Sequence, residues 1–290
     1  MAQTYDRSVE DLGNIVALEH VNVQIPDQQL ATVFYVSGLG LTRDPYLMTG
    51  TDNMWINVGR SQFHLPTGRP QVLRGHTGMV LPSREKLLRR LERVRPDLAG
   101  TAFDFHERNA FVDVTTPWGN RLRCFEPEAR FGAVSLAMPY VEFDVPAGSA
   151  AGIARFYRDI LAAPAVIGDD EGGRHARVAV GDRQELVYRE TDRPIPAYDG
   201  HHIQVYVADF AGPHRRLLAR GLISEESDQH QYRFLDILDL DSGKALFTIE
   251  HEVRSMRHPL YNRPLVNRNP AQTNRHYTPG QDAFPWSLPQ

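Results

Sequence analysis

The stretch that decides the fold is Leu18-Glu-His-Val-Asn-Val-Gln-Ile-Pro26, and a similar stretch, Met138-Pro-Tyr-Val-Glu-Phe-Asp-Val-Pro146, occurs in the second half of the chain. Each alternates polar and apolar residues and ends at a proline, and alternation with a period of two is typical of a half-buried strand. Each is followed by apolar residues at helical spacing that include a Phe-Tyr pair, Phe34-Tyr35 or Phe156-Tyr157. The two stretches therefore predict a repeated strand–helix unit.

Two shorter segments repeat the same theme. Residues 75–81 and 202–207 each predict a strand, and each precedes a segment whose leucines have helical spacing. Each then continues through a further strand and a turn, at 116–120 or 240–244, to a final strand. The chain is therefore predicted to contain four units, which begin near Ile15, Gly75, Met138 and Gly200. Because one unit cannot bury its sheet alone, we expect the units to share sheets in pairs.

The order of these motifs resembles the modules of the vicinal oxygen chelate superfamily, which includes glyoxalases, bleomycin-resistance proteins and extradiol dioxygenases. The resemblance covers about residues 15–253 and rests on the strand with its histidine, the Phe-Tyr pair and Gly38-Leu-Gly-Leu41. It implies an α+β fold in which four βαβββ modules pair into two domains with curved, partly closed mixed sheets and helices outside. The implied domains are residues 1–135 and 136–255, and residues 256–290 form a tail rich in Pro, Asn and Arg. In this arrangement Phe34 matches Phe156, and Gly119 matches Gly243.

The composition narrows the range of partners. A net charge of -4 without a basic cluster argues against binding to nucleic acid or to an anionic membrane. The single cysteine, Cys124, excludes an internal disulfide and favours a reducing compartment. The first 14 residues lack the apolar core of a signal peptide, and no apolar run reaches the roughly 18 residues of a membrane span. The composition therefore favours a cytoplasmic protein. The resemblance adds a small-molecule substrate, anionic or aromatic, and leaves homo-oligomerisation open.

Histidines on the polar faces of the predicted strands are the candidate metal ligands. Alternation puts His20 and Asn22 on one side of the first strand, and it puts Gln62 and His64 on one side of a later strand. The resemblance implies ligands from the first and last strands of each module in a pair, which by position selects His20, His64 and His76. Neutral imidazole suits divalent Fe, Mn, Zn or Ni, and three protein ligands leave a position open for substrate. We expect such a site to lose metal affinity below about pH 6, where free imidazole is protonated.

The fourth ligand position departs from the family pattern. Members usually carry a glutamate four residues after the turn glycine, but Gly119-Asn-Arg-Leu-Arg-Cys124 has Arg123 there. A guanidinium stays charged and does not ligate a metal, so Arg123 is predicted to bind an anionic group of the substrate. Glu126 is the nearest carboxylate, but alternation places it on the opposite face unless a bulge intervenes. Asn22 and Gln62 share the polar side and are the other predicted substrate-binding residues.

The second pair of units offers fewer ligands. Its matching positions hold Tyr140, Leu186, His202 and Phe247, which amounts to one imidazole and one phenol. Glu250 also lies in the predicted last strand of this pair. We therefore expect no transition metal there, and we expect either a second binding pocket or a duplicate without a ligand.

The resemblance implies a metal-dependent enzyme that acts on a small substrate with vicinal oxygens, and the four-module length favours an extradiol-type dioxygenase. Such dioxygenases usually keep a His, His, Glu triad in the C-terminal pair, which this chain does not. A glyoxalase-type isomerase or lyase is one alternative, and a metal-free binding protein of the resistance type is another. Metal analysis separates these alternatives, because metal that is lost on changing His64 supports an enzyme.

Overall fold

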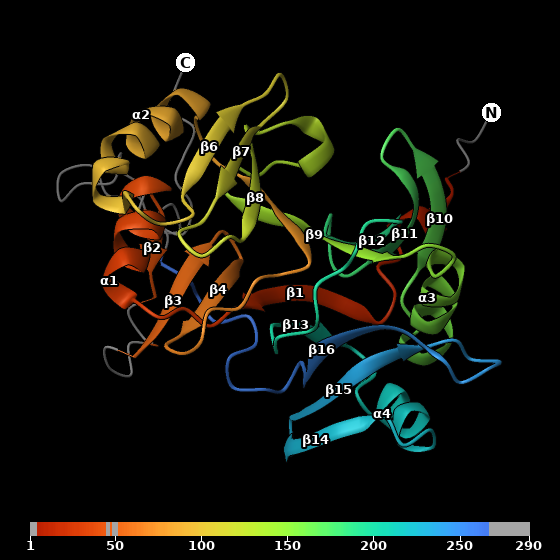
Figure 1. The fold of residues 1–290 in the computed structure, drawn as a ribbon. Coiled ribbons are helices and arrows are strands. Elements are labelled where there is room, and N and C mark those ends of the chain that lie inside the picture. Colours follow the sequence, from red (N-terminus) through yellow and green to blue (C-terminus); the bar gives the residue numbers. More distant parts are fainter. Residues whose placement is uncertain (1–4, 45–46, 48–51, 267–290) are drawn as a thin grey trace.

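The computed structural model describes residues 5–44, 47 and 52–266, and it shows an α+β fold with two open eight-stranded mixed sheets (Figure 1). The first sheet has the strand order β14-β15-β16-β13-β1-β4-β3-β2. The second has the order β10-β11-β12-β9-β5-β8-β7-β6. The predicted four-module α+β architecture is confirmed.

The elements have the following bounds. The first sheet contains β1 (Ile15–Asn22), β2 (Thr42–Arg43), β3 (Asn53–Val58), β4 (Ser61–Pro66), β13 (His202–Val207), β14 (Ile223–Asp228), β15 (Gln231–Leu238) and β16 (Ala245–Ser255). The second contains β5 (Gly75–Val80), β6 (Asp104–Glu107), β7 (Val112–Thr115), β8 (Arg121–Phe125), β9 (Ala137–Pro146), β10 (Ala165–Asp170), β11 (Gly173–Ala179) and β12 (Glu185–Thr191). The main helices are α1 (Gln28–Ala31), α2 (Arg84–Val94), α3 (Ala150–Phe156) and α4 (Ala211–Leu218). The π-helical turns η2 (Thr32–Gly38) and η5 (Tyr157–Leu161) extend α1 and α3.

The sheets pair the modules in a way that differs from the expectation. The first module supplies β1–β4 and shares its sheet with the fourth, because β1 pairs antiparallel with β13. The second and third modules share the other sheet through β5 and β9. Figure 1 shows β1, from the start of the chain, beside β13, from its last third. The expected boundary between residues 135 and 136 therefore does not separate the two sheets.

The first and second modules, and likewise the third and fourth, meet through their helices. The turn η2 of the first module packs on α2 of the second, and α4 of the fourth packs on η5 of the third. The helix α3 contacts strands of both sheets, so the helical layer lies on the apolar side of each. Among the described residues, no helix has the length and apolarity required to cross a membrane.

Alternation along the strands builds a main hydrophobic core that spans both sheets, beside a smaller cluster of Val80, Phe125 and Phe131. Val21 and Phe63 point into this core from β1 and β4, and the Phe63 ring lies 5.4 Å from the Tyr35 ring of η2. Phe34 and Phe156 are fully buried at matching places in the first and third modules, as expected. The polar residues of the same strands are consequently directed to the opposite face of the first sheet.

Gln184, in the turn between β11 and β12, joins the two sheets close to the start of β1. Its Oε1 accepts a hydrogen bond from the backbone N–H of Leu18 at 3.0 Å. Its Nε2 lies within hydrogen-bonding distance of the Leu18 carbonyl, the Ser61 hydroxyl and the Met138 carbonyl, at 3.0, 3.0 and 3.1 Å. The Gln184 amide therefore binds backbone groups of both sheets. One of them belongs to Leu18, two residues before His20.

We expect Gln184→Ala to lower the free energy of unfolding by about 1–3 kcal/mol, because it leaves the buried Leu18 N–H without an acceptor. Urea denaturation followed by circular dichroism measures this change. Asp182→Ala, in the same turn and exposed, is the matched control and should change stability by less than about 0.5 kcal/mol. Equal effects of the two substitutions would contradict the proposed role of the amide.

Candidate metal centre

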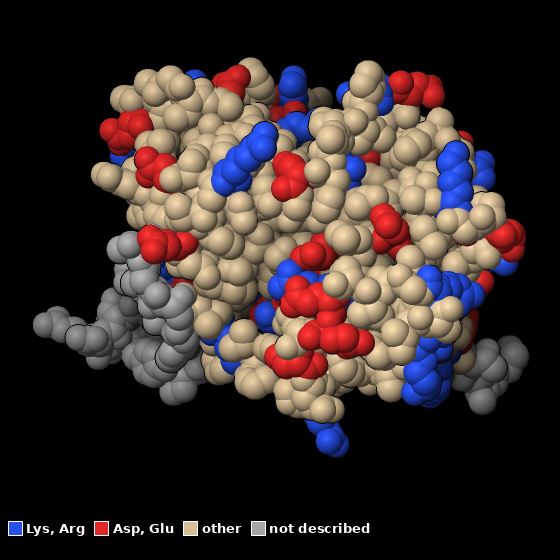
Figure 2. All heavy atoms as spheres, turned by 60° about the horizontal axis from the view of Figure 1, so that its bottom comes forward, with Lys and Arg blue, Asp and Glu red and all other residues tan. Residues whose placement is uncertain are grey.

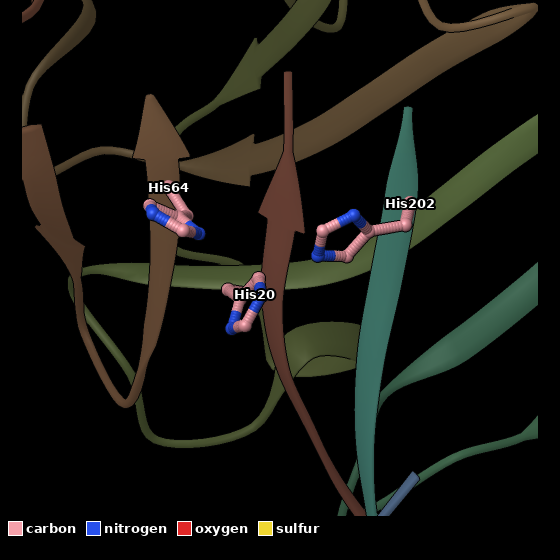
Figure 3. A group of neighbouring side chains, drawn as sticks. All are labelled: His20, His64 and His202. Carbon is pink, nitrogen blue, oxygen red and sulfur yellow. The ribbon is translucent and has the colours of Figure 1, made fainter. Parts of the chain in front are cut away.

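Three histidines meet on the polar face of the first sheet, each from a different strand (Figure 3). His20 lies on β1, and the strands of His64 and His202 flank β1 on its two sides. The backbone register explains the meeting, because Asn22 is the partner of His64 in the parallel pair and of His202 in the antiparallel pair. One candidate ligand atom from each of the three lies within 4.8 Å of the other two.

The Nε2 atoms of all three rings are buried and have no hydrogen-bond partner among the described residues. The Nδ1 atoms, in contrast, face polar groups. His20 Nδ1 lies 2.7 Å from Glu19 Oε2, and His64 Nδ1 lies 2.6 Å from the Asn22 amide. His202 Nδ1 lies 3.3 Å from Glu250 Oε1. Histidine ligands of metals commonly use one nitrogen for the metal and donate the other to a neighbouring group, and the carboxylates beside the Nδ1 atoms of His20 and His202 allow that arrangement. At His64 the neighbour is the Asn22 amide nitrogen, which donates to Nδ1.

A β-bulge and an indole hold two of these rings. The register of β1 against β13 shifts between Leu18 and His20, which lets the Glu19 side chain reach the ring of its neighbour. The Trp55 indole stacks on the His64 ring at 3.8 Å with an interplanar angle of 14°. Rings fixed in this way lose little further conformational freedom on binding an ion.

Burial keeps the three imidazoles neutral. It lowers the pKa of His64 to about 2, and the neighbouring His20 ring and nearby arginines act in the same direction. Burial also holds the pKa values of His20 and His202 well below 6.5. Neutral imidazole is the form that binds a metal ion, so the centre is ready for a ligand across the physiological pH range.

Glu252 on β16 holds the place in the fourth module that His64 holds in the first. His64 pairs with the residue two beyond His20, and Glu252 pairs with Gln204, the residue two beyond His202. Its Oε2 lies 3.5 Å from His202 Nε2, and burial raises the pKa of its carboxyl. The sequence analysis missed Glu252 because it paired the wrong modules.

Carboxylates outnumber guanidiniums beside the histidines. Arg233 contacts Glu250 and Glu252 at 2.5 and 2.6 Å, and Arg254 contacts Glu252 at 2.6 Å and Glu19 at 3.6 Å. When all five groups are ionised, three negative charges face two positive ones. Burial raises the pKa values of Glu19 and Glu252, and burial and the two arginines lower the pKa values of all three histidines, so the charges of these groups alone do not favour a cation. Three imidazoles with a nearby carboxylate nevertheless form a donor set that fits a divalent transition metal.

Asn22 and Gln62 lie on the same face of the first sheet as the histidines, and their role in binding substrate stays a prediction. The Asn22 amide contacts His64, and Gln62 is fully buried and is the register partner of His20. Gln62 Nε2 donates to Asp44 Oδ2 and to Asn57 Oδ1, both at 2.7 Å. Glu250, named from its place in the last predicted strand, also lies at the edge of the centre.

His76 is not part of this centre, and His202 takes the position that was expected for it. His76 lies on β5 in the second sheet, where its Nε2 is 3.2 Å from the Tyr140 hydroxyl and its Nδ1 is 3.8 Å from Glu142. The prediction that His76 joins His20 and His64 was wrong, because β1 pairs with β13 and not with β5. The expectation that His202 belongs to a metal-free pair rested on the same error.

Arg123 and Glu126 also lie away from the histidines. Arg123 is on β8 in the second sheet, half-exposed, with its guanidinium 5.1 Å from the Phe111 ring and 3.8 Å from Asp113. Glu126 follows β8, and its carboxylate accepts a hydrogen bond from the backbone N–H of Arg84 at 3.1 Å. Neither residue can serve the centre in the first sheet.

The polar face of the second sheet is filled by its own side chains. The Tyr140 ring covers Gly78, where a Cβ atom would lie 2.2 Å from the ring. Arg189 bonds to Glu142 at 3.0 Å and to Asp170 at 2.6 Å. Within the described ranges, the first sheet alone brings three or more metal-ligating groups together. Cys124, on β8, is buried with its pKa raised to about 12, which makes it a core residue and not a nucleophile.

Comparisons with known proteins identify the fold. No protein-family model matches the chain, and no curated protein matches it. The crystal structure of glyoxalase I from Zea mays has a TM-score of 0.60 at 12% identity, covering 82% of this chain and 92% of that one. The crystal structure titled "putative dioxygenase from Bacillus subtilis subsp. subtilis str. 168" has a TM-score of 0.54 at 16% identity, covering 84% and 86%. The chain therefore shares the fold of these two structures, which is the fold that the resemblance to the vicinal oxygen chelate superfamily implied.

Proposed function

We propose that this protein is a metal-dependent enzyme that acts on a small substrate with vicinal oxygens. The observation that carries the proposal is the set of three buried, unpartnered Nε2 atoms of His20, His64 and His202. Burying such groups without a partner costs about 1–3 kcal/mol each, which a bound ion would offset. These three residues would hold a divalent ion, and Glu252 is the fourth candidate ligand. A bound ion would be a Lewis acid that polarises the substrate, and the substrate would chelate it through two neighbouring oxygens.

The side chains around the ion have separate tasks. Glu252 can hold or release a proton, because burial raises the pKa of its carboxyl while Arg254 and Arg233 oppose that shift. Trp55 covers one face of His64 and excludes water from that side. Asn22 and Glu19 fix the orientation of two ligand rings through their Nδ1 atoms. The residues thus bind the ion, orient its ligands and place a proton carrier beside it.

An extradiol-type dioxygenase is the favoured reaction class, supported by the four-module length and by the likeness in fold to a structure titled as a putative dioxygenase. The second candidate is a glyoxalase-type isomerase, which the glyoxalase I fold and the buried Glu252 support. An isomerase needs a residue that moves a proton between neighbouring carbons, and Glu252 is suited to that task. The mixed charge of the surface in Figure 2, where acidic and basic side chains are interspersed, fits a small-molecule enzyme better than a polyanion-binding protein.

We expect one divalent transition metal ion per chain and expect His202→Ala to weaken its binding at least tenfold, because one of three ligands is removed. Metal analysis after gel filtration, with a competing chelator, measures this effect. His76→Ala is the matched control, since this histidine lies in the other sheet, and its metal affinity should stay within about twofold of wild type. Loss of metal in His76→Ala with retention in His202→Ala would refute the assignment.

The pH dependence of metal binding should be shallow, contrary to the expectation from free imidazole. An unshifted imidazole would lose about thirtyfold in affinity at pH 5 for each ring, because pH 5 lies roughly 1.5 units below its pKa. With the pKa of His64 near 2, its folded ring stays unprotonated there. We therefore expect the apparent dissociation constant to change less than about threefold between pH 7.5 and pH 5, as measured by calorimetric titration.

The lowered pKa values of the histidines also make the stability of the folded protein depend on pH. This dependence is opposite in sign to that of a histidine whose pKa is raised by an ion pair. The unfolded chain takes up protons on these histidines below about pH 6.5, whereas the folded chain does not. The free energy of unfolding of the metal-free protein should therefore fall as the pH drops below 6.5. A steep loss of metal at pH 6 from protein that remains folded would contradict the pKa assignment.

Two assays separate the reaction classes. The iron- or manganese-loaded protein should consume dioxygen in the presence of a catechol and form a coloured ring-cleaved product, and His64→Ala should abolish this activity. The isomerase alternative predicts instead that a hemithioacetal is converted without dioxygen uptake, and that Glu252→Gln slows this conversion at least a hundredfold. Metal-loaded protein that does neither, but still binds catechol, would overturn the enzymatic proposal in favour of a binding protein.

A further inference from the structure

The chain that follows β16 lies across the polar face of the first sheet. The Tyr261 ring packs 4.8 Å from the ring of Tyr206 on β13. Farther along, the carbonyl of Val266 accepts hydrogen bonds from Thr42 Oγ1 at 2.7 Å and from Asn57 Nδ2 at 2.8 Å. The segment 256–266 is therefore attached to β13 at one point and to β2 and β3 at another, on the two sides of β1.

Arg263 lies between these two attachments and points toward the metal centre. Its Nη2 donates to the Asp44 carboxylate and lies 3.3 Å from Gln62 Oε1. Gln62 is the register partner of His20 and shares the face of His64. Asp44 is itself fixed, because it accepts hydrogen bonds from Gln62 and from the backbone N–H of Leu47. The guanidinium is thus anchored by one of its three nitrogens.

The other two nitrogens of Arg263 have no acceptor in the part of the chain that the structure describes. Nε and Nη1 are both buried and lack a hydrogen-bond partner among the described residues. The whole side chain is only 14% exposed, so bulk water does not satisfy these donors. Buried donors of a charged group left in this condition are costly, and a ligand with acceptor oxygens would relieve that cost.

A cavity of about 260 Å³ opens beside this guanidinium. Its described lining consists of Leu47, Leu260, Pro264 and Arg263. Three of the four are apolar, so the cavity offers one charged donor against a hydrophobic wall. A pocket of this kind fits a ligand with an apolar body and a single anionic group.

We propose that Arg263 is the specificity-determining residue of the site and that it binds a carboxylate on the substrate, whose apolar body fills the cavity beside Leu260. The substrate class is therefore a small aromatic or aliphatic carboxylate that also carries vicinal oxygens. This inference rests on the proposed function for the vicinal oxygens, but the carboxylate contact does not depend on the ion. A carboxylate is favoured over a neutral acceptor because hydrogen bonds between two charged groups are about twice as strong.

Three probes test the proposal with calorimetry on the full chain. Metal-loaded protein is titrated with 3,4-dihydroxybenzoate and with 3,4-dihydroxybenzamide, which differ only in the charge of one group. Metal-free protein is titrated with benzoate, which lacks vicinal oxygens. We expect wild type to bind the acid at least tenfold more tightly than the amide, and to bind benzoate without metal.

Variants at Arg263 then show whether this residue causes the preference for the acid over the amide. Arg263→Gln should reduce the preference for the acid to less than about twofold and abolish benzoate binding, with little change in affinity for the amide. Arg263→Lys keeps a charge near Asp44 and should fold where the Gln variant does not, with a preference reduced severalfold because the planar guanidinium is lost. Arg257→Gln, in the same segment and exposed, is the matched control and should behave as wild type.

The outcomes distinguish this inference from the proposed function. If the amide binds the loaded protein and the acid has no advantage, the role of Arg263 is overturned while the metal centre stands. Retention of the whole preference in both Arg263 variants overturns it as well. If benzoate binds in an Arg263-dependent way but no metal is taken up, the carboxylate site stands and the metal-dependent function fails.

Discussion

Three buried imidazole nitrogens that have no partner among residues 5–44, 47 and 52–266 are the constraint on which the rest of the first sheet depends. A fold normally pairs such groups, because each one left unpaired reduces stability by an amount comparable to a whole hydrogen bond. Here the surrounding structure keeps them unpaired. Glu19 and Asn22 contact the Nδ1 atoms of His20 and His64, and the Trp55 indole stacks on one face of the His64 ring. The unpaired nitrogens lower the stability of the folded protein, which is typical of a site that is organised for a ligand.

The sequence predicted the elements and the faces but not the pairing of the modules. Alternation around His20 and His64 identified both strands and the side of the sheet on which each ring lies, because that periodicity is a local property. Which strand lies beside β1 is decided by contacts between residues far apart in the chain, and no local pattern encodes it. His76 and His202 both begin a strand with a similar pattern, so adjacency along the chain selected the wrong one. Glu252 and Arg263 were missed for the same reason, since their roles depend on what lies opposite them.

The two sheets show how one arrangement of modules supports two different interiors. In the second sheet, Gly78 leaves room for the Tyr140 ring, and Arg189 forms ion pairs with two carboxylates, so these side chains cover the polar face themselves. In the first sheet, the corresponding face keeps histidines and a buried amide, Gln204, whose oxygen and nitrogen both lack a partner. The difference lies in the side chains and not in the backbone topology. Fold likeness alone therefore cannot assign a function to either half.

The pairing of β1 with β13 also determines when the protein can finish folding. Residue 20 emerges early from the ribosome, but its partner strand is made only after the first three modules, so most of the chain must be synthesised before the first sheet can close. Until then β1 has one edge without a partner, and an unpaired edge strand is a site of aggregation. Contacts that join such distant residues raise the contact order and slow the final step. His20, His64 and His202 come from β1, β4 and β13, so these residues, if they held an ion, would stabilise the contact between strands that form late in synthesis and strands that form early.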